Sequence, residues 1–338
     1  MTTDNAYKVK WGVLGTGWIS HQFVTDLAHA ANGVAYAVGS RSLESAEKFA
    51  TDHGVPVAYA TYEELVNDPE VDAVYIGTPH PLHKDNALLA LRAGKAVLCE
   101  KPFTVNSAEL EEIAAYAKHN KLFLMEAMWS RFIPAIAKVR EWIAAGRIGE
   151  VRLVKADLGF RADWNPEGRL LNPKLGGGAL LDVGIYPISF ASMVLGPHPE
   201  QIHSTVHIGE TGVDEHFSLL LSYGGGVTAS INGGVRLNLL NEAYIFGTEG
   251  HIMVPGTLVN PTKAVLHSAD GVTETFEEQR ESIGYAYEAE EVGRCLEAGL
   301  TESPVITLDE SVAILKLLDR VRGQWGLVYP GEAELKQH

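Results

Sequence analysis

The tripeptide Gly15-Thr16-Gly17 constrains the fold of this chain more than any other feature. It stands directly after the apolar run Trp11–Leu14 and in front of a helical pattern. With Ser20 it matches the G-x-G-x-x-G/A pattern of dinucleotide-binding turns, with Ser in the third place. Gly15 permits the tight turn, Gly17 lets the backbone approach a pyrophosphate, and the helix N-terminus supplies amide donors. The residues expected to contact a dinucleotide here are Gly15, Thr16, Gly17, Trp18 and Ile19.

The pattern around this turn repeats up to about Met128. Short apolar or β-branched runs alternate with amphipathic segments, which is typical of βαβ units on a parallel sheet. We therefore predict an α/β chain whose N-terminal part is a doubly wound Rossmann sheet. The predicted strands are Lys10–Gly15, Val34–Gly39, Pro56–Tyr59, Ala73–Gly77, Ala96–Cys99 and Leu122–Leu124, and helices are predicted at His83–Ala93 and Ser107–Lys118.

A second domain is predicted after Arg131. One more amphipathic helix runs to about Ala145, and apolar runs separated by turn residues then suggest hairpins in a large, mostly antiparallel open sheet of an α+β domain. The domain boundaries are set at 1–128, 129–305 and 306–338, the last being a helix that packs back on the Rossmann domain. The predicted strands are Val151–Phe160, Gln201–Ile208, His216–Tyr223, Gly226–Asn232 and Ala243–Phe246, and the predicted helices are Ala179–Leu195, Tyr285–Ala298 and Leu308–Gln324.

Composition narrows the partners and the compartment. The 27 Lys and Arg against 43 Asp and Glu give a net charge of −16, which repels phosphate backbones and anionic lipid surfaces, so no nucleic acid and no membrane are expected as partners. No apolar run approaches the roughly 20 residues that a membrane span needs. Cys99 and Cys295 are far apart and form no CxxC pair, which favours a reducing, cytoplasmic location.

The end of the second predicted strand bears on the choice of cofactor. An NAD-specific enzyme usually places an acid there to bind the ribose hydroxyls, but this chain reads Ser40-Arg41. An Arg guanidinium can receive a 2′-phosphate as a bidentate partner, so NADP is the predicted cofactor. NAD remains possible as well, and a solvated Arg at the start of a helix is the alternative for Arg41.

Two residues are candidates for acid–base chemistry. Oxidising an alcohol requires a group that takes the hydroxyl proton as hydride leaves for the nicotinamide, and Lys101 and Tyr186 are of the right type. A cation beside a phenol favours the phenolate, so Tyr186 is assigned as the acid/base and Lys101 as the cation that assists it and holds the substrate oxygen. The reverse assignment stays open. Asp182 lies one helical turn before Tyr186 and is expected to orient the reacting hydroxyl.

Three segments carry a resemblance to a known family. They are Gly77-Thr78-Pro79-His80-Pro81-Leu82-His83, Cys99-Glu100-Lys101-Pro102 and Gly176–Tyr186, which holds the pattern G-G-G-x-x-x-D-x-G. Together they resemble the Gfo/Idh/MocA oxidoreductases over nearly the whole chain. The stretches Leu124–Phe132 and Glu210–Asp214 resemble the dimeric dihydrodiol dehydrogenase branch, as does Tyr186, where most of the family has His. The dihydrodiol branch tends to carry a second Arg where this chain has Ser45, a departure that tempers the NADP assignment.

The resemblance implies an NADP-dependent dehydrogenase acting on a CH–OH group of a small polyhydroxylated substrate, such as D-xylose or a trans-dihydrodiol. It also implies a homodimer or a dimer of dimers. Trp129 either stacks on the substrate ring or belongs to the core, and the H-x-x-H spacing of His80 and His83 is not expected to bind a metal because no third ligand is well placed. Further cofactor contacts implied by the resemblance are Thr78, Pro79, His80, His83, Glu100 and Lys101.

Two alternatives remain. One keeps the fold and the oxidoreductase chemistry but changes the specificity, as in anhydrofructose or inositol enzymes; Tyr186 in place of His argues against the inositol type. The other is a sensor of nucleotides or sugars without catalysis, whose mark would be loss of the catalytic Lys, and Lys101 is present.

Overall fold

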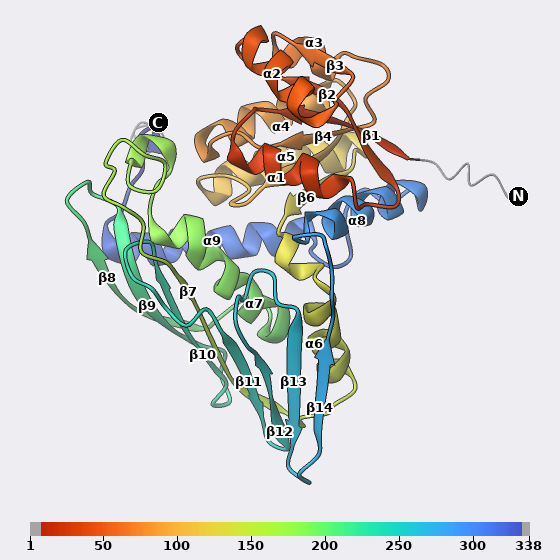
Figure 1. The fold of residues 1–338 in the computed structure, drawn as a ribbon. Coiled ribbons are helices and arrows are strands. Elements are labelled where there is room, and N and C mark those ends of the chain that lie inside the picture. Colours follow the sequence, from red (N-terminus) through yellow and green to blue (C-terminus); the bar gives the residue numbers. More distant parts are fainter. Residues whose placement is uncertain (1–7, 333–338) are drawn as a thin grey trace, which may run out of the picture. The chain divides into compact units, whose positions relative to one another are not determined.

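A computed structural model describes residues 8–332 of the chain, which divides into two compact units (Figure 1). The first unit contains the chain up to Thr104, residues Ala108–Phe132 and residues Glu281–Ser311. The second contains Val105–Ser107, Ile133–Arg280 and the chain from Val312 onward. The predicted boundaries placed residues 281–305 in the second domain and residues 306–338 on the Rossmann domain. The structure instead groups Glu281–Ser311 with the first unit and the chain from Val312 onward with the second.

The first unit is built on a six-stranded parallel sheet with the strand order β3-β2-β1-β4-β5-β6. This is the doubly wound Rossmann order, in which the chain moves outward from β1 in one direction and then, after a crossover, in the other. The α/β prediction is confirmed, and each predicted strand overlaps an observed one. The strands are β1 (Val9–Leu14), β2 (Gly33–Gly39), β3 (Val57–Tyr59), β4 (Ala73–Ile76), β5 (Ala96–Glu100) and β6 (Leu124–Ala127).

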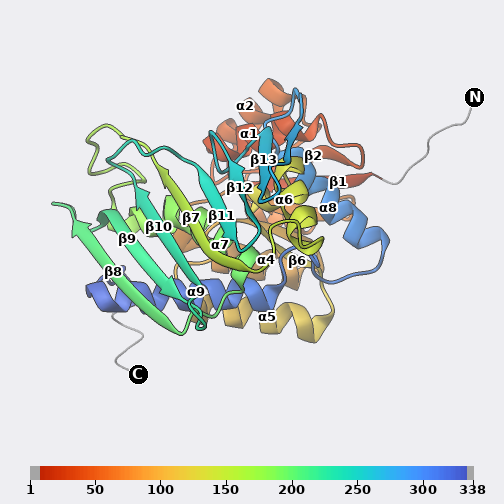
Figure 2. The same cartoon turned by 90° about the horizontal axis from the view of Figure 1, so that it is seen from below.

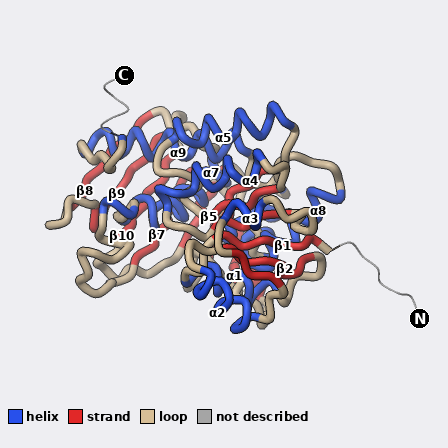
Figure 3. The backbone as a smooth tube through the Cα atoms, turned by 90° about the horizontal axis from the view of Figure 1, so that it is seen from above, coloured by secondary structure: helices blue, strands red, loops and turns tan. Residues whose placement is uncertain are grey.

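Helices cover both faces of this sheet (Figure 3). One face carries α1 and α2, and the other carries α3, α4 and α5, as the right-handed crossover rule requires. Strands buried on both faces must be apolar throughout, and β4 and β5 are buried at every residue. The helices are α1 (Trp18–Leu27), α2 (Leu43–His53), α3 (Tyr62–Val66), α4 (His83–Arg92) and α5 (Ser107–Asn120), with short 3₁₀ turns at His80–Leu82 and Trp129–Arg131.

A helix from late in the sequence completes the first unit. Helix α8 (Tyr285–Glu297) packs on α1 and β2, and Figure 1 shows it in blue beside the red and orange strands. Its N-terminus is capped by Asp26, whose carboxylate accepts hydrogen bonds from the backbone N–H groups of Ile283 (2.7 Å), Gly284 (2.8 Å) and Ala286 (3.0 Å). The predicted boundaries placed this helix in the second domain, whereas these contacts tie it to the first unit.

The second unit is built on an eight-stranded sheet with the order β14-β13-β12-β11-β7-β10-β9-β8 (Figure 2). Every neighbouring pair is antiparallel except β7 with β10, so the prediction of a mostly antiparallel sheet is confirmed. Sequence analysis missed the last three strands. The strands are β7 (Val151–Gly159), β8 (Gln201–Ile208), β9 (Asp214–Ser222), β10 (Thr228–Gly234), β11 (Ala243–Gly247), β12 (Gly250–Val254), β13 (Lys263–Ser268) and β14 (Thr273–Glu277).

One face of this sheet is covered by α6 (Pro134–Ala144) and α7 (Ile185–Leu195), and the C-terminal part of α9 (Leu308–Trp325) lies beside β8 and β9. The stretch Pro173–Leu195, which ends with α7, has 23 residues and is by length and composition apolar enough to cross a membrane. This corrects the expectation that no apolar run approaches that length. The most apolar 18 residues of the stretch are 78% buried within the structure, which is also the pattern of a core helix.

The opposite face of the eight-stranded sheet is open to view in Figure 2, with the strands in front of the helices. Side chains alternate along the strands, so that in β9 Phe217, Leu219 and Leu221 are buried while Leu220 is 46% exposed. A row of stacked rings crosses the open face, from Tyr244 through Phe246 and His251 to His267. The open face is therefore partly apolar and aromatic.

Candidate active site

The predicted cofactor residues of the first unit lie at or just after the carboxyl ends of neighbouring strands. Strands β2, β1, β4 and β5 are adjacent and parallel, so the segments that follow them lie along one edge of the sheet. Ligands of open α/β sheets bind at this edge, at the point where the strand order reverses, here between β1 and β4. These segments begin at Gly15, Ser40, Gly77 and Lys101.

The glycine turn has the geometry that a pyrophosphate requires. Gly15 has φ +95°, which a side chain rarely adopts, and a Cβ on Gly17 would meet no atom closer than 3.9 Å. Gly17 is the N-cap of α1 and contributes no side-chain hydrogen bond, and the first turn of α1 holds no acid. The amide donors and the positive end of the helix dipole are therefore presented toward an anion, and the residues present fit a dinucleotide.

Ser20, in the third place of the motif, is fully buried. A Cβ on Gly77, at the end of β4, would stand only 2.4 Å from its Oγ, so the serine and this glycine allow α1 to approach β4 closely. The small third residue of the motif thus serves close packing of the helix on the strand. Trp18, one residue after Gly17, is 71% exposed, whereas Thr16 and Ile19 are half-buried.

Ser40 and Arg41 follow β2. Ser40 is buried and its Oγ accepts a long hydrogen bond, 3.5 Å, from the backbone N–H of Ser42. Arg41 is exposed. Burial raises the pKa of the Tyr62 phenol, and the Arg41 charge partly opposes this. An exposed positive side chain thus follows β2 at this edge of the sheet.

His83 ties together the loops after β4 and β5. Its ring is fully buried, with Nε2 2.7 Å from the carbonyl oxygen of Thr78 and Nδ1 2.9 Å from that of Pro102. Both ring nitrogens therefore face backbone oxygens. His80 is buried beside it, with ring centroids 5.7 Å apart, and Pro79 is exposed.

Residues 8–332 contain no group of three or more His, Cys, Asp or Glu side chains that could hold a metal ion.

Glu100 is the last residue of β5 and is buried next to the predicted catalytic lysine. The Tyr75 hydroxyl donates to Glu100 Oε1 at 2.6 Å, and the backbone N–H of Lys101 donates to Glu100 Oε2 at 3.2 Å. The carboxylate thus orients the backbone of Lys101 from within the sheet. The Lys101 side chain itself is half-buried.

The second unit contains Asp182 and Tyr186. Asp182 lies on a π-helical turn (Leu180–Gly184), and Tyr186 lies in the first turn of α7, which follows directly. Both are nearly buried, at 5% and 8% exposure. Arg169 forms an ion pair with Asp182, with Nη1 2.5 Å from Oδ1. π-Helical turns are uncommon and frequently lie at functional sites.

The glycines before this turn are required by close backbone contacts. A Cβ on Gly177 would stand 2.8 Å from the carbonyl oxygen of Leu170, and one on Gly178 would stand 2.2 Å from Asp214 Oδ1. A Cβ on Gly184 would stand 2.5 Å from the Phe217 ring. The G-G-G-x-x-x-D-x-G motif therefore packs one loop and one helical turn against β9 and the preceding loop.

Trp129 lies in the first unit, is 5% exposed and stacks on Tyr285 with ring centroids 4.3 Å apart. Trp129 is therefore buried, as expected of a core residue, and its contact with a substrate ring stays a prediction.

The structure gathers the predicted cofactor residues and Lys101 in the first unit, and Asp182 and Tyr186 in the second. Sequence analysis missed Tyr75 and Arg169, the partners of Glu100 and Asp182, because nothing in their spacing marks them.

The comparisons with known proteins agree with this geometry. A family model described as an oxidoreductase family with an NAD-binding Rossmann fold matches residues 9–128, and a GFO/IDH/MocA C-terminal domain model matches residues 136–253. Two relatives named trans-1,2-dihydrobenzene-1,2-diol dehydrogenase are similar along almost their whole length. The Homo sapiens protein is 40% identical over 95% of this chain and 98% of its own, and the Sus scrofa protein is 42% identical over the same shares.

Solved structures are similar as well. A 3-ketoreductase from Actinomadura kijaniata in complex with NADP and TDP-benzene is 27% identical, with a TM-score of 0.81 over 94% of this chain and 97% of that one. An aldose-aldose oxidoreductase from Caulobacter crescentus shares the fold, with a TM-score of 0.84 over 93% of this chain and 96% of that one, at 24% identity. With an NAD-binding Rossmann unit at its start and a matching second domain, the chain belongs to the GFO/IDH/MocA family of oxidoreductases.

Proposed function

We propose that this oxidoreductase is an NADP-dependent dehydrogenase that oxidises a CH–OH group of a small polyhydroxylated substrate, a trans-dihydrodiol or an aldopyranose such as D-xylose. The observation that carries the proposal is the position of Lys101, which follows β5 on the same sheet edge as the glycine turn. The dihydrodiol dehydrogenases that are about 40% identical along the chain support the substrate class.

Each candidate residue has a role in this reaction. A nicotinamide cofactor bound at the sheet edge would supply the hydride acceptor. Tyr186 takes the hydroxyl proton of the substrate, so the alcohol loses one proton and one hydride and becomes a carbonyl. The Lys101 ammonium holds the substrate oxygen and favours the phenolate of Tyr186. Asp182, which forms an ion pair with Arg169 in a nearly buried position, accepts a hydrogen bond from a substrate hydroxyl.

A lysine substitution tests the chemistry. We expect Lys101→Met to lower kcat for D-xylose or a trans-dihydrodiol by at least 100-fold, because it removes the cation at the reacting oxygen, while the Kd of NADP changes little. Lys84→Met is the matched control, since Lys84 is on α4 of the same unit and pairs with Glu112 on the surface. Turnover is measured by the absorbance of the reduced nicotinamide. Wild-type turnover by the Lys101 variant would remove this residue from the mechanism.

The preference for NADP rests on Arg41. A charge-assisted contact to a 2′-phosphate contributes about 1.5–3 kcal/mol, so Arg41→Ala is expected to raise the Kd of NADP about 10- to 100-fold and to leave that of NAD nearly unchanged. Equal weakening of both cofactors would contradict the phosphate contact. Arg92→Ala, at the end of α4, serves as a control for the loss of one surface charge.

We further propose that the chain forms a homodimer through the open face of the eight-stranded sheet and acts in the cytoplasm. The exposed Leu220 and the ring row from Tyr244 to His267 support a partner on this face. Analytical ultracentrifugation of the Leu220→Asp variant tests the interface. A dimer that is unaffected by this charge would place the contact elsewhere.

A further inference from the structure

The glycine loop that leads to Asp182 is held by two residues to which the proposed function gives no role. The Tyr329 hydroxyl donates a buried hydrogen bond of 2.6 Å to the carbonyl oxygen of Gly177. Asp214 Oδ2 accepts a buried hydrogen bond of 2.6 Å from the backbone N–H of Leu180. Between these contacts a Cβ on Gly178 would stand 2.2 Å from Asp214 Oδ1 and 3.0 Å from the Tyr329 oxygen. The side chains of Tyr329 and Asp214 therefore both pack directly against the backbone of this loop.

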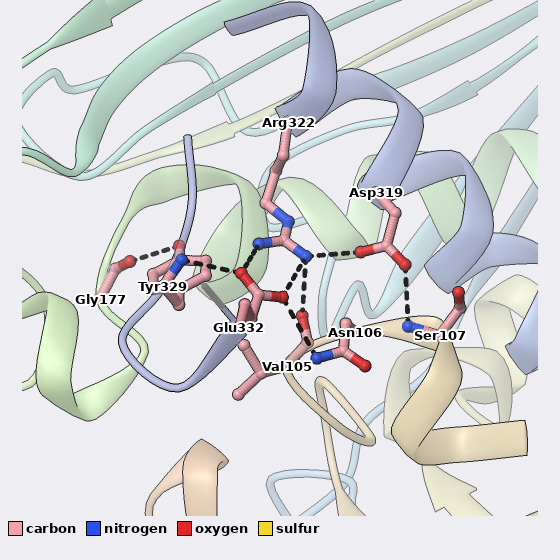
Figure 4. Close-up of polar contacts among 8 residues, drawn as sticks. All are labelled: Val105, Asn106, Ser107, Gly177, Asp319, Arg322, Tyr329 and Glu332. Carbon is pink, nitrogen blue, oxygen red and sulfur yellow. Dashed lines mark hydrogen bonds and ion pairs between the residues drawn. The ribbon is translucent and has the colours of Figure 1, made fainter. Parts of the chain in front are cut away.

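Tyr329 is itself fixed by a partly buried ion pair between Arg322 and Glu332 (Figure 4). Arg322 binds Glu332 in a bidentate manner, with Nη1 2.8 Å from Oε2 and Nη2 2.9 Å from Oε1. Glu332 Oε2 also accepts the backbone N–H of Tyr329 at 2.8 Å, and the Arg322 guanidinium lies 5.1 Å from the centre of the Tyr329 ring. Bidentate charged pairs are strong and fix geometry, so the turn that carries Tyr329 is anchored in the second unit.

The same cluster binds the segment Val105–Ser107, as Figure 4 shows. Arg322 Nη2 donates to the carbonyl oxygen of Val105 at 3.3 Å, and Asp319 Oδ2 accepts the backbone N–H of Ser107 at 2.9 Å. Asp319 in turn pairs with Arg322 at 2.5 Å. One charged cluster thus holds both the C-terminal turn and the chain that follows the Glu100-Lys101-Pro102 motif.

A direct backbone contact transmits the position of the loop to the predicted catalytic residues. The N–H of Asp182 donates to the carbonyl oxygen of Gly178 at 3.3 Å, at the start of the π-helical turn from which α7 and Tyr186 continue. A displacement of about 1 Å at reacting groups can lower a rate by about 100-fold. Small movements of Gly177 and Gly178 would therefore be felt at Asp182 and Tyr186.

We propose that Tyr329 and Asp214 are positioning residues of the enzyme, which fix the glycine loop and through it Asp182 and Tyr186. The C-terminal turn Gly326–Glu332 then helps to position the substrate-binding residues of the second unit. This inference rests on the proposed function for the roles of Asp182 and Tyr186.

Removal of one oxygen atom tests the Tyr329 clamp. Tyr329→Phe keeps the ring over Arg322 and loses only the bond to Gly177. We expect kcat to fall about 10-fold while the Kd of NADP is unchanged, since the cofactor residues belong to the first unit. Amide hydrogen exchange of residues 178–180 is expected to accelerate. Tyr223→Phe is the control for loss of a tyrosine hydroxyl, because Tyr223 is a half-buried tyrosine of the same unit, in the connection between β9 and β10.

Asp214 is tested by a variant that keeps its shape. Burial raises the pKa of Asp214 to about 7, and the Leu180 amide and the Arg322 charge that face it oppose the rise; the Tyr329 hydroxyl is the other titratable group near it. Asp214→Asn retains an acceptor for Leu180 but cannot ionise. We expect kcat of the wild type to change between pH 6 and 8 through this group, and that component to be absent in Asp214→Asn.

The outcomes are distinct. Faster exchange at residues 178–180 together with lower kcat supports the proposal. Faster exchange with wild-type kcat, or lower kcat with unchanged exchange, overturns it, and so does an unchanged pH profile in Asp214→Asn. A wild-type protein that turned over none of the sugars or diols would refute the proposed function, and the exchange measurement would still decide whether the clamp exists.

Discussion

Among the polar side chains of the first unit, we expect substitution of Asp26 to lower the free energy of unfolding most. It lies near the end of α1, is 2% exposed, and caps α8, which follows it by more than 250 residues in the sequence. Asp26→Ala would leave the N–H groups of Gly284 and Ala286, both in buried hydrogen bonds, without an acceptor. The effect should therefore exceed that of an exposed N-cap.

The magnitude follows from the two buried donors. Each buried donor left unsatisfied costs about 1–3 kcal/mol, whereas the donors of Ile283 and Ser282 are only partly buried and can turn to water. We expect Asp26→Ala to lower the free energy of unfolding by about 3 kcal/mol. Asp26→Asn retains one acceptor oxygen and loses the charge that favours a helix N-terminus, so about 1 kcal/mol is expected.

Thermal unfolding of the intact chain, followed by circular dichroism, is the assay. For a unit of this size 1 kcal/mol corresponds to about 2–4 °C, so the Ala variant should melt about 6–12 °C lower. The exposed Asp52, paired with Lys48 on α2, provides a control, and Asp52→Ala should leave the midpoint nearly unchanged. An Ala variant that melts with the wild type, or an Asn variant as unstable as the Ala variant, would refute the reasoning.

Two further predictions concern buried ionisable groups. Burial raises the pKa of Glu126 from 4.5 to about 7, so its contribution to stability is complete below pH 4.5 and is lost as the pH rises through 7. Between pH 5 and pH 8, denaturation of Glu126→Gln should therefore show a smaller decrease in the free energy of unfolding than the wild type. An equal decrease would contradict the assignment. Cys99 and Cys295 are buried, and burial raises the pKa of Cys295 to about 12. Neither thiol should react with a disulfide reagent before unfolding, a result that rapid labelling of the native protein would overturn.

Much of the fold is predictable from the sequence because the parallel sheet imposes a strong pattern. Strands buried on both faces need continuous apolar runs, as in β4 and β5, and Gly15 marks the first turn. The last strands were missed because their signal is weak. In β14 charged and polar residues alternate around a single half-buried Phe276, as expected of an edge strand, and nothing in this pattern distinguishes it from a loop.

Site residues could be proposed from the sequence where they stand in a motif, and not where they act from a distance. Lys101 and Asp182 were predicted because the motifs contain them. Tyr75, Arg169 and Tyr329 hold these motifs in place, yet they lie 26, 13 and 152 residues from Lys101, Asp182 and Gly177. These side chains reach their partners only in the folded protein, and a single sequence does not show which distant residues come together.

The discontinuity of the first unit has a consequence for how the protein is made. All six strands of its sheet have left the ribosome once Ala127 emerges, but Tyr285 follows only after the entire eight-stranded sheet has been synthesised. At about 5–20 residues per second this interval is on the order of ten seconds or more. During this interval the carboxylate of Asp26 and the surface of α1 lack the contacts that α8 later makes with them. A fragment ending at residue 128 would reproduce that unfinished state permanently, and a stable cofactor-binding fragment needs α8 joined back to it.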